Sequence, residues 1–282
     1  MSPERDFTAF ARMVDALGPY LADLVFVGGW AHFLYTLRPE ASPLGFTPLT
    51  TQDVDVATPP RLARREQTIA QRLIAAGFEQ RLSGDHAPPV SHYALGDEET
   101  GFYVEFLAPL EGGEVKRGGR PDMTTTVGGV TAQRLRHLEI LLTGPWQVTI
   151  SREEGFPVSK RAKIRIPNPA AYIVQKVLVL RKRKPDELPK DVLYLHDTFA
   201  VFSDSLPVVR SCWNALCREM HPNHIRSFER GSRELIANVT NVARGGAIIA
   251  AGRPRPPTPE ILLAGLRRGF ADGFDIHAGE RG

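Results

Sequence analysis

The sequence predicts an α/β protein with an N-terminal mixed sheet, flanked by helices, and a mostly α-helical C-terminal domain. Short apolar runs alternate with helically spaced segments up to about residue 150, as in a compact α/β domain. From residue 168 onward the apolar spacing is helical. Because 282 residues suffice for two ordinary domains, we expect one domain over 1–150 and a second over 151–282.

The N-terminal half alternates helices with short strands. The run from Leu24 to Val27 is apolar throughout, and Gly28-Gly29 breaks it before a helical pattern resumes at Trp30. The expected elements are a helix over 7–22, a strand over 24–27, a helix over 30–37, a proline-rich loop over 38–48, a strand over 53–57, a helix over 61–77 with Gly77 as its C-cap, strands near 91–95 and 102–107, and a connection or hairpin over 111–129.

In the C-terminal half the strand signal fades after about residue 150. Prolines and a glycine over 252–257 predict an extended linker, and we expect the tail after Gly273 to be frayed. The expected helices cover 170–184, 190–203, 206–220, 229–243 and 259–270.

Bulk composition is that of a soluble globular protein, with 42% hydrophobic and 24% charged residues. No segment approaches the roughly 20 apolar residues that span a bilayer, and the charged N-terminus lacks the apolar core of a signal peptide. We therefore expect a cytoplasmic protein without a membrane partner. In that compartment Cys212 and Cys217 are expected to be reduced thiols rather than metal ligands.

The most informative feature is an Asp-x-Asp motif, Asp53 and Asp55, about twenty residues after Gly28-Gly29. Side chains repeat every two residues on a strand, so both carboxylates lie on one face. They repel each other unless a cation lies between them, and Mg²⁺ bridging them to a triphosphate resolves the conflict. The glycines let backbone N–H groups meet phosphate. The plainer alternatives are a solvated strand end and a tight turn that binds no ligand.

Glu105 is the third candidate carboxylate. Along its strand Phe102, Val104 and Phe106 share one face, whereas Tyr103, Glu105 and Leu107 share the other. A buried ionised glutamate is costly without a partner, which a metal or a neighbouring base would supply. The alternative is an edge-strand salt bridge. Thr50 and Thr51 beside the motif could contact phosphate or be ordinary strand residues.

Charged residues on the C-terminal helices form a second candidate group. Lys176 lies in an otherwise apolar helical stretch, so it is expected to face either a triphosphate or a structural carboxylate. Arg181 is more peripheral, and Asp191 could be an ordinary helix cap. Residues 152–190 hold eleven Lys or Arg against four Asp or Glu, a net charge of +7 suited to phosphate-rich partners such as NTP and RNA. A solvated helix face and loop is the alternative.

Taken together, these residues resemble the polymerase-β-like nucleotidyltransferase superfamily. Within it the chain is most similar to the AbiEii/MenT-like toxins of type IV toxin–antitoxin systems. The matching pieces, over about residues 24–197, are Val27-Gly28-Gly29-Trp30-Ala31, Thr51-Gln52-Asp53-Val54-Asp55, Glu105, Lys176 with Arg181, and Lys190-Asp191.

The resemblance implies a nucleotidyltransferase fold in the N-terminal domain and Mg²⁺ held by Asp53 and Asp55, with Glu105 as the third metal ligand. It implies an NTP bound by the residues Gly28, Gly29, Thr51, Lys176 and Arg181, with Asp191 supporting the site. It also implies transfer of a nucleotide to an acceptor, which in similar toxins is the 3′ end of tRNA. A cognate antitoxin protein would neutralise such a toxin.

Two positions depart from the family pattern. Leu49 stands where the family often has an arginine, for which Arg38 could substitute, and Gly28-Gly29 stands where a Gly-Ser pair is usual. Two other functions stay open. A small-molecule enzyme that modifies aminoglycosides or lincosamides would use the same carboxylates, with Glu105 as the base. A catalytically silent protein would only bind nucleotide or RNA.

Overall fold

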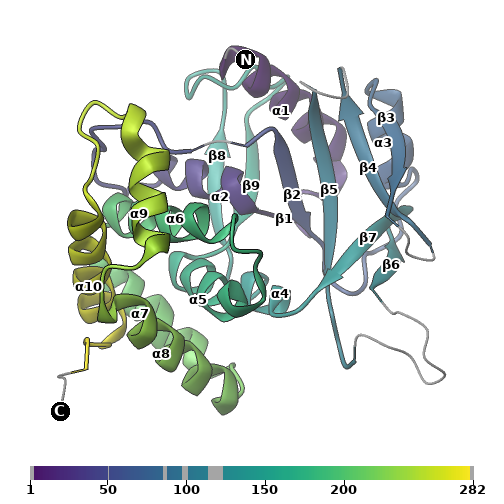
Figure 1. The fold of residues 1–282 in the computed structure, drawn as a ribbon. Helices are drawn as coiled ribbons and strands as arrows, with labels where there is room; N and C mark the ends of the chain where they lie inside the picture. Colours follow the sequence, from purple (N-terminus) through teal and green to yellow (C-terminus); the bar gives the residue numbers. More distant parts are fainter. Residues whose placement is uncertain (1–2, 50, 85–87, 97–100, 114–122, 280–282) are drawn as a thin grey trace. The chain divides into compact units, whose positions relative to one another are not determined.

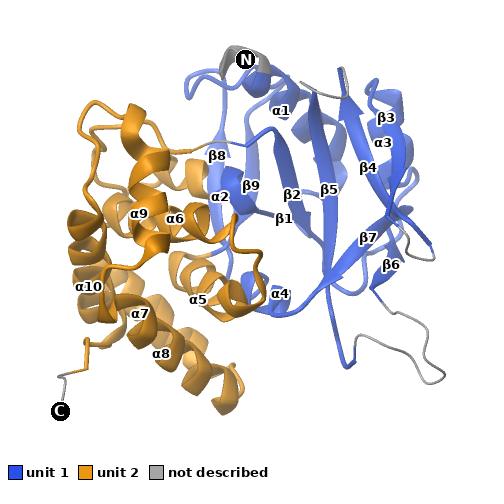
Figure 2. Cartoon of the chain, viewed as in Figure 1, with its two compact units in different colours: residues 1–31, 50–167 blue, residues 32–49, 168–282 orange. Residues whose placement is uncertain are grey.

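The computed structural model describes residues 3–49, 51–84, 88–96, 101–113 and 123–279. It divides the chain into two compact units (Figure 2). Unit 1 comprises Met1–Ala31 and Thr50–Pro167, and unit 2 comprises His32–Leu49 and Asn168–Gly282. The mixed sheet with helices and the helical C-terminal region confirm the predicted fold class.

Unit 1 is built on a mixed sheet whose main strands follow the order β1-β2-β5-β4-β3, with a β6–β7 hairpin joined to β5 (Figure 1). The pairs β2–β5 and β5–β7 are parallel, and the other pairs in this sheet are antiparallel. The strands are β1 (Val25–Val27), β2 (Asp53–Ala57), β3 (Glu79–Ser83), β4 (Val90–Leu95), β5 (Phe102–Pro109), β6 (Thr124–Val127) and β7 (Val130–Leu135).

One face of this sheet is apolar and is covered by aromatic side chains. Val54 and Val56 of β2 and their neighbours on β5 are fully buried, as strict alternation along the strands requires. Phe10 of α1 (Pro3–Leu17) stacks on Trp30, with ring centroids 4.1 Å apart. Trp30 in turn meets Phe102 of β5 edge-on at 6.2 Å. This packing fixes both central strands, so their alternate side chains must point to the opposite face.

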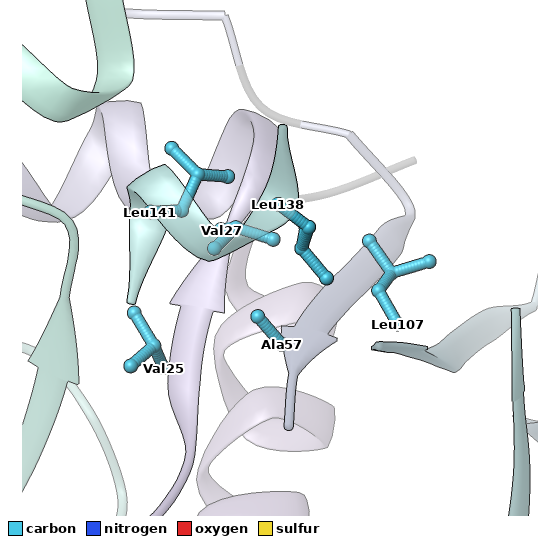
Figure 3. Packing of buried hydrophobic residues seen from close by; sticks show 6 residues of the cluster. All are labelled: Val25, Val27, Ala57, Leu107, Leu138 and Leu141. Carbon is cyan, nitrogen blue, oxygen red and sulfur yellow. The ribbon is translucent and has the colours of Figure 1, made fainter. Parts of the chain in front are cut away.

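The opposite face is apolar only near the ends of β2 and β5. Six buried residues form a cluster there, and two of them come from the short helix α4 (Leu138–Leu141) (Figure 3). The residues are Val25, Val27, Ala57, Leu107, Leu138 and Leu141. The earlier part of the same face carries the half-buried Asp53, Asp55, Tyr103 and Glu105.

Several predicted elements of unit 1 differ from the structure. The helix expected over 61–77 is shorter, since α3 covers only Ile69–Ala75. Thr68 starts it with a capping box, in which its hydroxyl accepts from Gln71 N and the Gln71 side chain accepts from Thr68 N. The helix expected from Trp30 begins earlier, as α2 (Gly28–Leu34), and continues as the 3₁₀ turn Tyr35–Leu37.

Strands also continue past the point where the strand signal fades. The antiparallel pair β8 (Trp146–Ile150) and β9 (Ala162–Ile166) forms a separate two-stranded sheet in unit 1. Within 111–129, residues 114–122 lie outside the described residues, and the rest leads into the β6–β7 hairpin. That hairpin turns at Gly128-Gly129, where both glycines have positive φ.

The regular elements of unit 2 are all helices among its described residues, and the N-terminal segment 32–49 packs against them. The single helix expected over 229–243 is wrong, because Thr240 caps the N-terminus of a new helix by accepting a hydrogen bond from Ala243 N. The helices are α5 (Pro169–Val179), α6 (Leu188–Val201), α7 (Leu206–Cys217), α8 (Pro222–Ala237), α9 (Asn241–Ile249) and α10 (Pro259–Phe274).

Aromatic rings hold the helices of unit 2 together. Phe199 of α6 meets Phe270 of α10 at 5.1 Å, and Trp213 of α7 meets Phe228 of α8 at 5.0 Å. The chain end is ordered further than expected, since Ile276 is buried and its N–H donates to Phe270 O. None of the described helices is long and apolar enough to cross a membrane. No disulfide joins Cys212 to Cys217.

The segment 32–49, expected to be a helix end and a loop, packs against the helices of unit 2. Ser42 N donates to Val201 O at 2.6 Å, and the Tyr35 ring meets Phe202 edge-on. The guanidinium of Arg253 lies 4.0 Å from the centre of the Phe46 ring. These contacts are long-range in sequence, which explains why residue spacing alone does not reveal them.

A buried ion pair lies at the centre of unit 2. Asp197 is fully buried and accepts two hydrogen bonds from the guanidinium of Arg253 and one from His196 Nδ1. Although burial raises the pKa of Asp197, the His196 and Arg253 hydrogen bonds outweigh it and hold the pKa below its usual value. The nearby His32 is also fully buried, and neither of its ring nitrogens has a hydrogen-bond partner among the residues that the structure describes.

Burial lowers the pKa of His32 to about 4, because the charged imidazolium is poorly solvated there. The unfolded chain takes up a proton near pH 6.5, so stability present above that pH is lost as the pH falls towards 4. We expect the free energy of unfolding to fall by about 2 kcal/mol more in the wild type than in His32→Phe between pH 7 and pH 5. Denaturant unfolding at both pH values measures this difference, and an equal loss in both proteins would contradict it.

Candidate active site

Three carboxylates converge on one face of the unit 1 sheet. In the parallel pairing of β2 with β5, Asp55 lies opposite Glu105 and Asp53 lies opposite Tyr103. Paired strands are about 4.8 Å apart, so side chains in register on one face are immediate neighbours. All three acids are half-buried. The predicted sharing of one face by Asp53 and Asp55 is thus present, and Glu105 joins them from the neighbouring strand.

The glycine turn lies directly against one of these carboxylates. Gly28 has a φ of +65°, and a Cβ at this position would clash with Asp55 Oδ2. Two independent constraints therefore require glycine here, the backbone conformation and the close approach of the carboxylate. Gly29 follows in the first turn of α2. The predicted pairing of the Gly-Gly turn with the Asp-x-Asp strand is thus a contact in space.

The carboxylates on this face also affect the pKa of Tyr103. Its pKa is raised to about 12, first by burial and then by the charges of Asp53, Glu105 and Asp55. Tyr103 is thus protonated at neutral pH by a wider margin than an ordinary tyrosine, whose pKa is about 10. Sequence reasoning placed Tyr103 on this face without giving it a role.

Glu105 has a hydrogen-bonding neighbour that sequence reasoning missed. His92 of β4 lies opposite Glu105 in the antiparallel register, and its Nδ1 is 2.8 Å from Glu105 Oε1. The other ring nitrogen, Nε2, is within hydrogen-bond distance of Ser83 Oγ on β3. The strand over 91–95 was expected from the sequence, but only the pairing of β4 with β5 connects His92 to Glu105.

Thr51 uses its hydroxyl and its carbonyl in local structure. The Oγ1 hydroxyl donates to Asp53 O at 3.0 Å, and Trp30 Nε1 donates to Thr51 O at 3.0 Å. These bonds tie the start of the Asp-x-Asp strand to the helix that follows the glycine turn. The neighbouring Thr50 lies outside the described residues.

In unit 2, Lys176 faces a carboxylate, which was one of the two expected partners. Lys176 of α5 and Asp191 of α6 are both buried, and Lys176 Nζ lies 2.6 Å from Asp191 Oδ1. The ammonium also lies 5.0 Å from the centre of the Tyr194 ring. Arg183 Nε reaches the second oxygen of Asp191 at 3.1 Å. Asp191 therefore balances two cations and is more than a helix cap.

The remaining predicted side chains of unit 2 are engaged nearer the surface. Arg181 pairs with Glu234 at 2.6 Å, and both side chains are more than half exposed. Arg38 forms a two-bond ion pair with Glu40. Leu49, at the position of the missing family arginine, packs against a small cluster around Leu193.

The carboxylate face fits a divalent cation. Mg²⁺ prefers carboxylate oxygens, and three acids offer such oxygens on adjacent strands. Asp53 makes no ion pair with any residue that the structure describes. Burial raises the pKa of Tyr103, and the charges of Asp53, Glu105 and Asp55 on the same face raise it further. Asp53, Asp55 and Glu105 are thus the residues that would hold the metal.

Comparison with known proteins identifies the family. A family model described as nucleotidyltransferase matches residues 5–216, about three quarters of the chain. The chain belongs to this nucleotidyltransferase family. As such it is an enzyme that uses an NTP and transfers a nucleotide to an acceptor. No curated protein and no solved structure gave a match.

The match covers the carboxylate face of the nucleotidyltransferase as well as Lys176, Arg181 and Asp191. It supports the resemblance at the level of nucleotidyl transfer and does not distinguish the toxin branch from others.

The contact between Gly28 and Asp55 leads to a first prediction on activity. Gly28→Ala places a methyl group against the Asp55 carboxylate and adds roughly 1–2 kcal/mol of backbone strain at positive φ. Because a displacement of about 1 Å in a catalytic group can cost about 10²-fold, we expect nucleotidyl transfer to fall by that order. Transfer rates and thermal unfolding of Gly18→Ala provide the control, since a Cβ there meets nothing within 4 Å. Full activity in Gly28→Ala would contradict the prediction.

Proposed function

We propose that this nucleotidyltransferase is Mg²⁺-dependent and transfers a nucleotide from an NTP to RNA, at the 3′ end of tRNA. We further propose that it acts in the cytoplasm as a growth-arresting toxin that a cognate antitoxin protein neutralises. The observation that carries the reaction is the single face formed by Asp53, Asp55 and Glu105, with the Gly28 turn against Asp55. The acceptor and the toxin role are supported by surface charge and by the motif resemblance.

In the proposed reaction an acceptor hydroxyl attacks the α-phosphorus of the NTP, and the bond to pyrophosphate breaks. When bound, Mg²⁺ supplies Lewis-acid activation of the phosphate and lowers the pKa of the attacking hydroxyl. Asp53, Asp55 and Glu105 provide the oxygen ligands for it. We propose that the backbone of Gly28 and Gly29 and the hydroxyl of Thr51 contact phosphate oxygens. We also propose that Lys176 and Arg181 supply positive charge for the triphosphate.

The RNA acceptor is supported by exposed cations in each unit. In unit 1 the side chains of Lys160, Arg161 and Lys163 are exposed, at and before β9, and pair with no acid among the described residues. In unit 2 residues 181–187 are all exposed and include Lys184. Phosphate contacts from such side chains supply most of the non-specific affinity of proteins for nucleic acids.

The toxin role is supported by the combination of motifs in one chain. The Gly-Gly turn and the Asp-x-Asp strand occur together with Lys176 and Asp191, which belong to the toxin-like pattern. The buried pairing of Lys176 with Asp191 keeps both residues in a fixed arrangement within unit 2. An antibiotic-modifying enzyme would need an acceptor site for small cationic or polar molecules, and the exposed basic segments favour a polyanion instead.

The direct test is incubation with Mg²⁺, each labelled NTP separately, and total tRNA. We expect label in the tRNA with at least one NTP, and a loss on the order of 10³-fold in Asp53→Asn, because this change removes a metal ligand from the transition state. Asp204→Asn, an exposed aspartate in unit 2, is the matched control and should keep full activity.

Two results would contradict the proposal. If the folded protein transfers no nucleotide from any NTP to tRNA, RNA is not its acceptor. Label on an aminoglycoside or lincosamide instead would favour an antibiotic-modifying enzyme. Unchanged transfer activity in Asp53→Asn would contradict the proposed role of the carboxylates as metal ligands in the reaction.

Variants of Lys176 and Asp191 can distinguish a role of this ion pair in stability from a role of Lys176 in binding NTP. Asp191→Leu leaves the buried Lys176 ammonium without its carboxylate and should lower the free energy of unfolding by roughly 3–5 kcal/mol. Lys176→Met leaves Asp191 paired with Arg183 and should lower it less. The double variant Lys176→Met, Asp191→Leu should recover most of the lost stability. If Lys176 binds the triphosphate, the double variant still has a raised KM for NTP. A stable double variant with the wild-type KM would limit this pair to folding.

A further inference from the structure

His92 is placed to control the third carboxylate of the active site. It lies on β4, opposite Glu105 of β5, and the two side chains meet at 2.8 Å between His92 Nδ1 and Glu105 Oε1. Both are mostly covered, with side-chain exposures of 21% for His92 and 24% for Glu105. A hydrogen bond in such a position is less exposed to competition from water than one at the open surface.

Both ring nitrogens of His92 are already used. A carboxylate only accepts hydrogen bonds when ionised, so Nδ1 must carry the hydrogen that Glu105 receives. Nε2 faces Ser83 Oγ, whose hydroxyl donates to it when the ring is neutral. With both nitrogens engaged, His92 is not itself a metal ligand in this arrangement. Its influence on the site runs through Glu105.

The orientation of Glu105 is the quantity that this contact fixes. A glutamate side chain has three rotatable bonds, and Asp55 opposite it on β2 carries a like charge that favours turning away. The hydrogen bond from His92 holds one carboxylate oxygen and leaves the other, Oε2, available to a cation. Tyr103, whose ring centroid lies 6.1 Å from that of His92, limits the movement of the imidazole on the same face.

We propose that His92 is a positioning residue that holds Glu105 in the orientation needed to bind the divalent metal, with Ser83 fixing the ring. This inference rests on the proposed function, because it takes Asp53, Asp55 and Glu105 as the metal ligands. Hydrogen-bond partners of metal ligands typically contribute 10- to 100-fold to metal affinity. His92 should therefore matter to metal binding even when no NTP or acceptor is present.

The experiment measures Mn²⁺ binding to the full chain by the loss of the free-ion electron paramagnetic resonance signal. We expect His92→Leu to bind Mn²⁺ roughly 10- to 100-fold more weakly than the wild type. His92→Asn places an amide N–H where Nδ1 lies and should restore most of the affinity. His92→Gln, whose amide overlies the distal nitrogen Nε2, should restore less. Thermal unfolding confirms that each variant is folded. If His92→Leu does not fold, the Mn²⁺ affinities of His92→Asn and His92→Gln are compared instead.

The outcomes separate this inference from the proposed function. If the wild type binds Mn²⁺ and Asp53→Asn does not, the metal site stands. Equal affinity of the wild type, His92→Leu and His92→Gln would then overturn the positioning role alone. If the folded wild type binds no Mn²⁺, the metal-dependent function and the role of His92 both fall.

Discussion

The parallel pairing of β2 with β5 brings the three carboxylates of the candidate active site together. Its register places Asp55 opposite Glu105 and, through the alternation of side chains, directs Asp53 to the same face. A register shift of one residue would send the acids into the aromatic cluster around Phe10 and Trp30, at a large desolvation cost. The packing of the apolar face therefore holds the like charges together on the other.

Concentrated negative charge is tolerated here because the acids are only half-buried and have local compensation. Water still reaches them, and His92 donates to Glu105 while Tyr103 keeps its proton. The fold thus stabilises the arrangement without cancelling its charge. A cation that binds between the carboxylates gains from this residual field, and this links the stability of the sheet to the proposed chemistry.

In unit 2, by contrast, the buried carboxylates are paired with cationic side chains. Asp197 is matched by Arg253, and Asp191 is matched by Lys176 and Arg183. Such pairs join α6 to its neighbours, and removing one partner is costly because the other is left uncompensated. If Lys176 binds the triphosphate as proposed, the triphosphate competes with Asp191 for the Lys176 ammonium.

Local patterns in the sequence are enough to predict the fold class, the Asp-x-Asp strand and the Gly-Gly turn. These follow from local rules: alternation assigns Asp53 and Asp55 to one face, and a glycine pair after an apolar run indicates a sharp turn. The short strands β8 and β9 and the capping of α3 at Thr68 were missed, because brief segments carry little periodic signal.

Contacts between residues that are distant in the sequence depend on the assembled fold. The contact of Gly28 with Asp55, the pairing of His92 with Glu105 and the inclusion of residues 32–49 in the helical unit depend on strand order and helix packing. Strand neighbours are set by the burial of whole faces and not by residues adjacent in the chain. The carboxylates can therefore be predicted from the sequence, whereas their neighbours, such as His92 beside Glu105, are known only from the pairing of the strands.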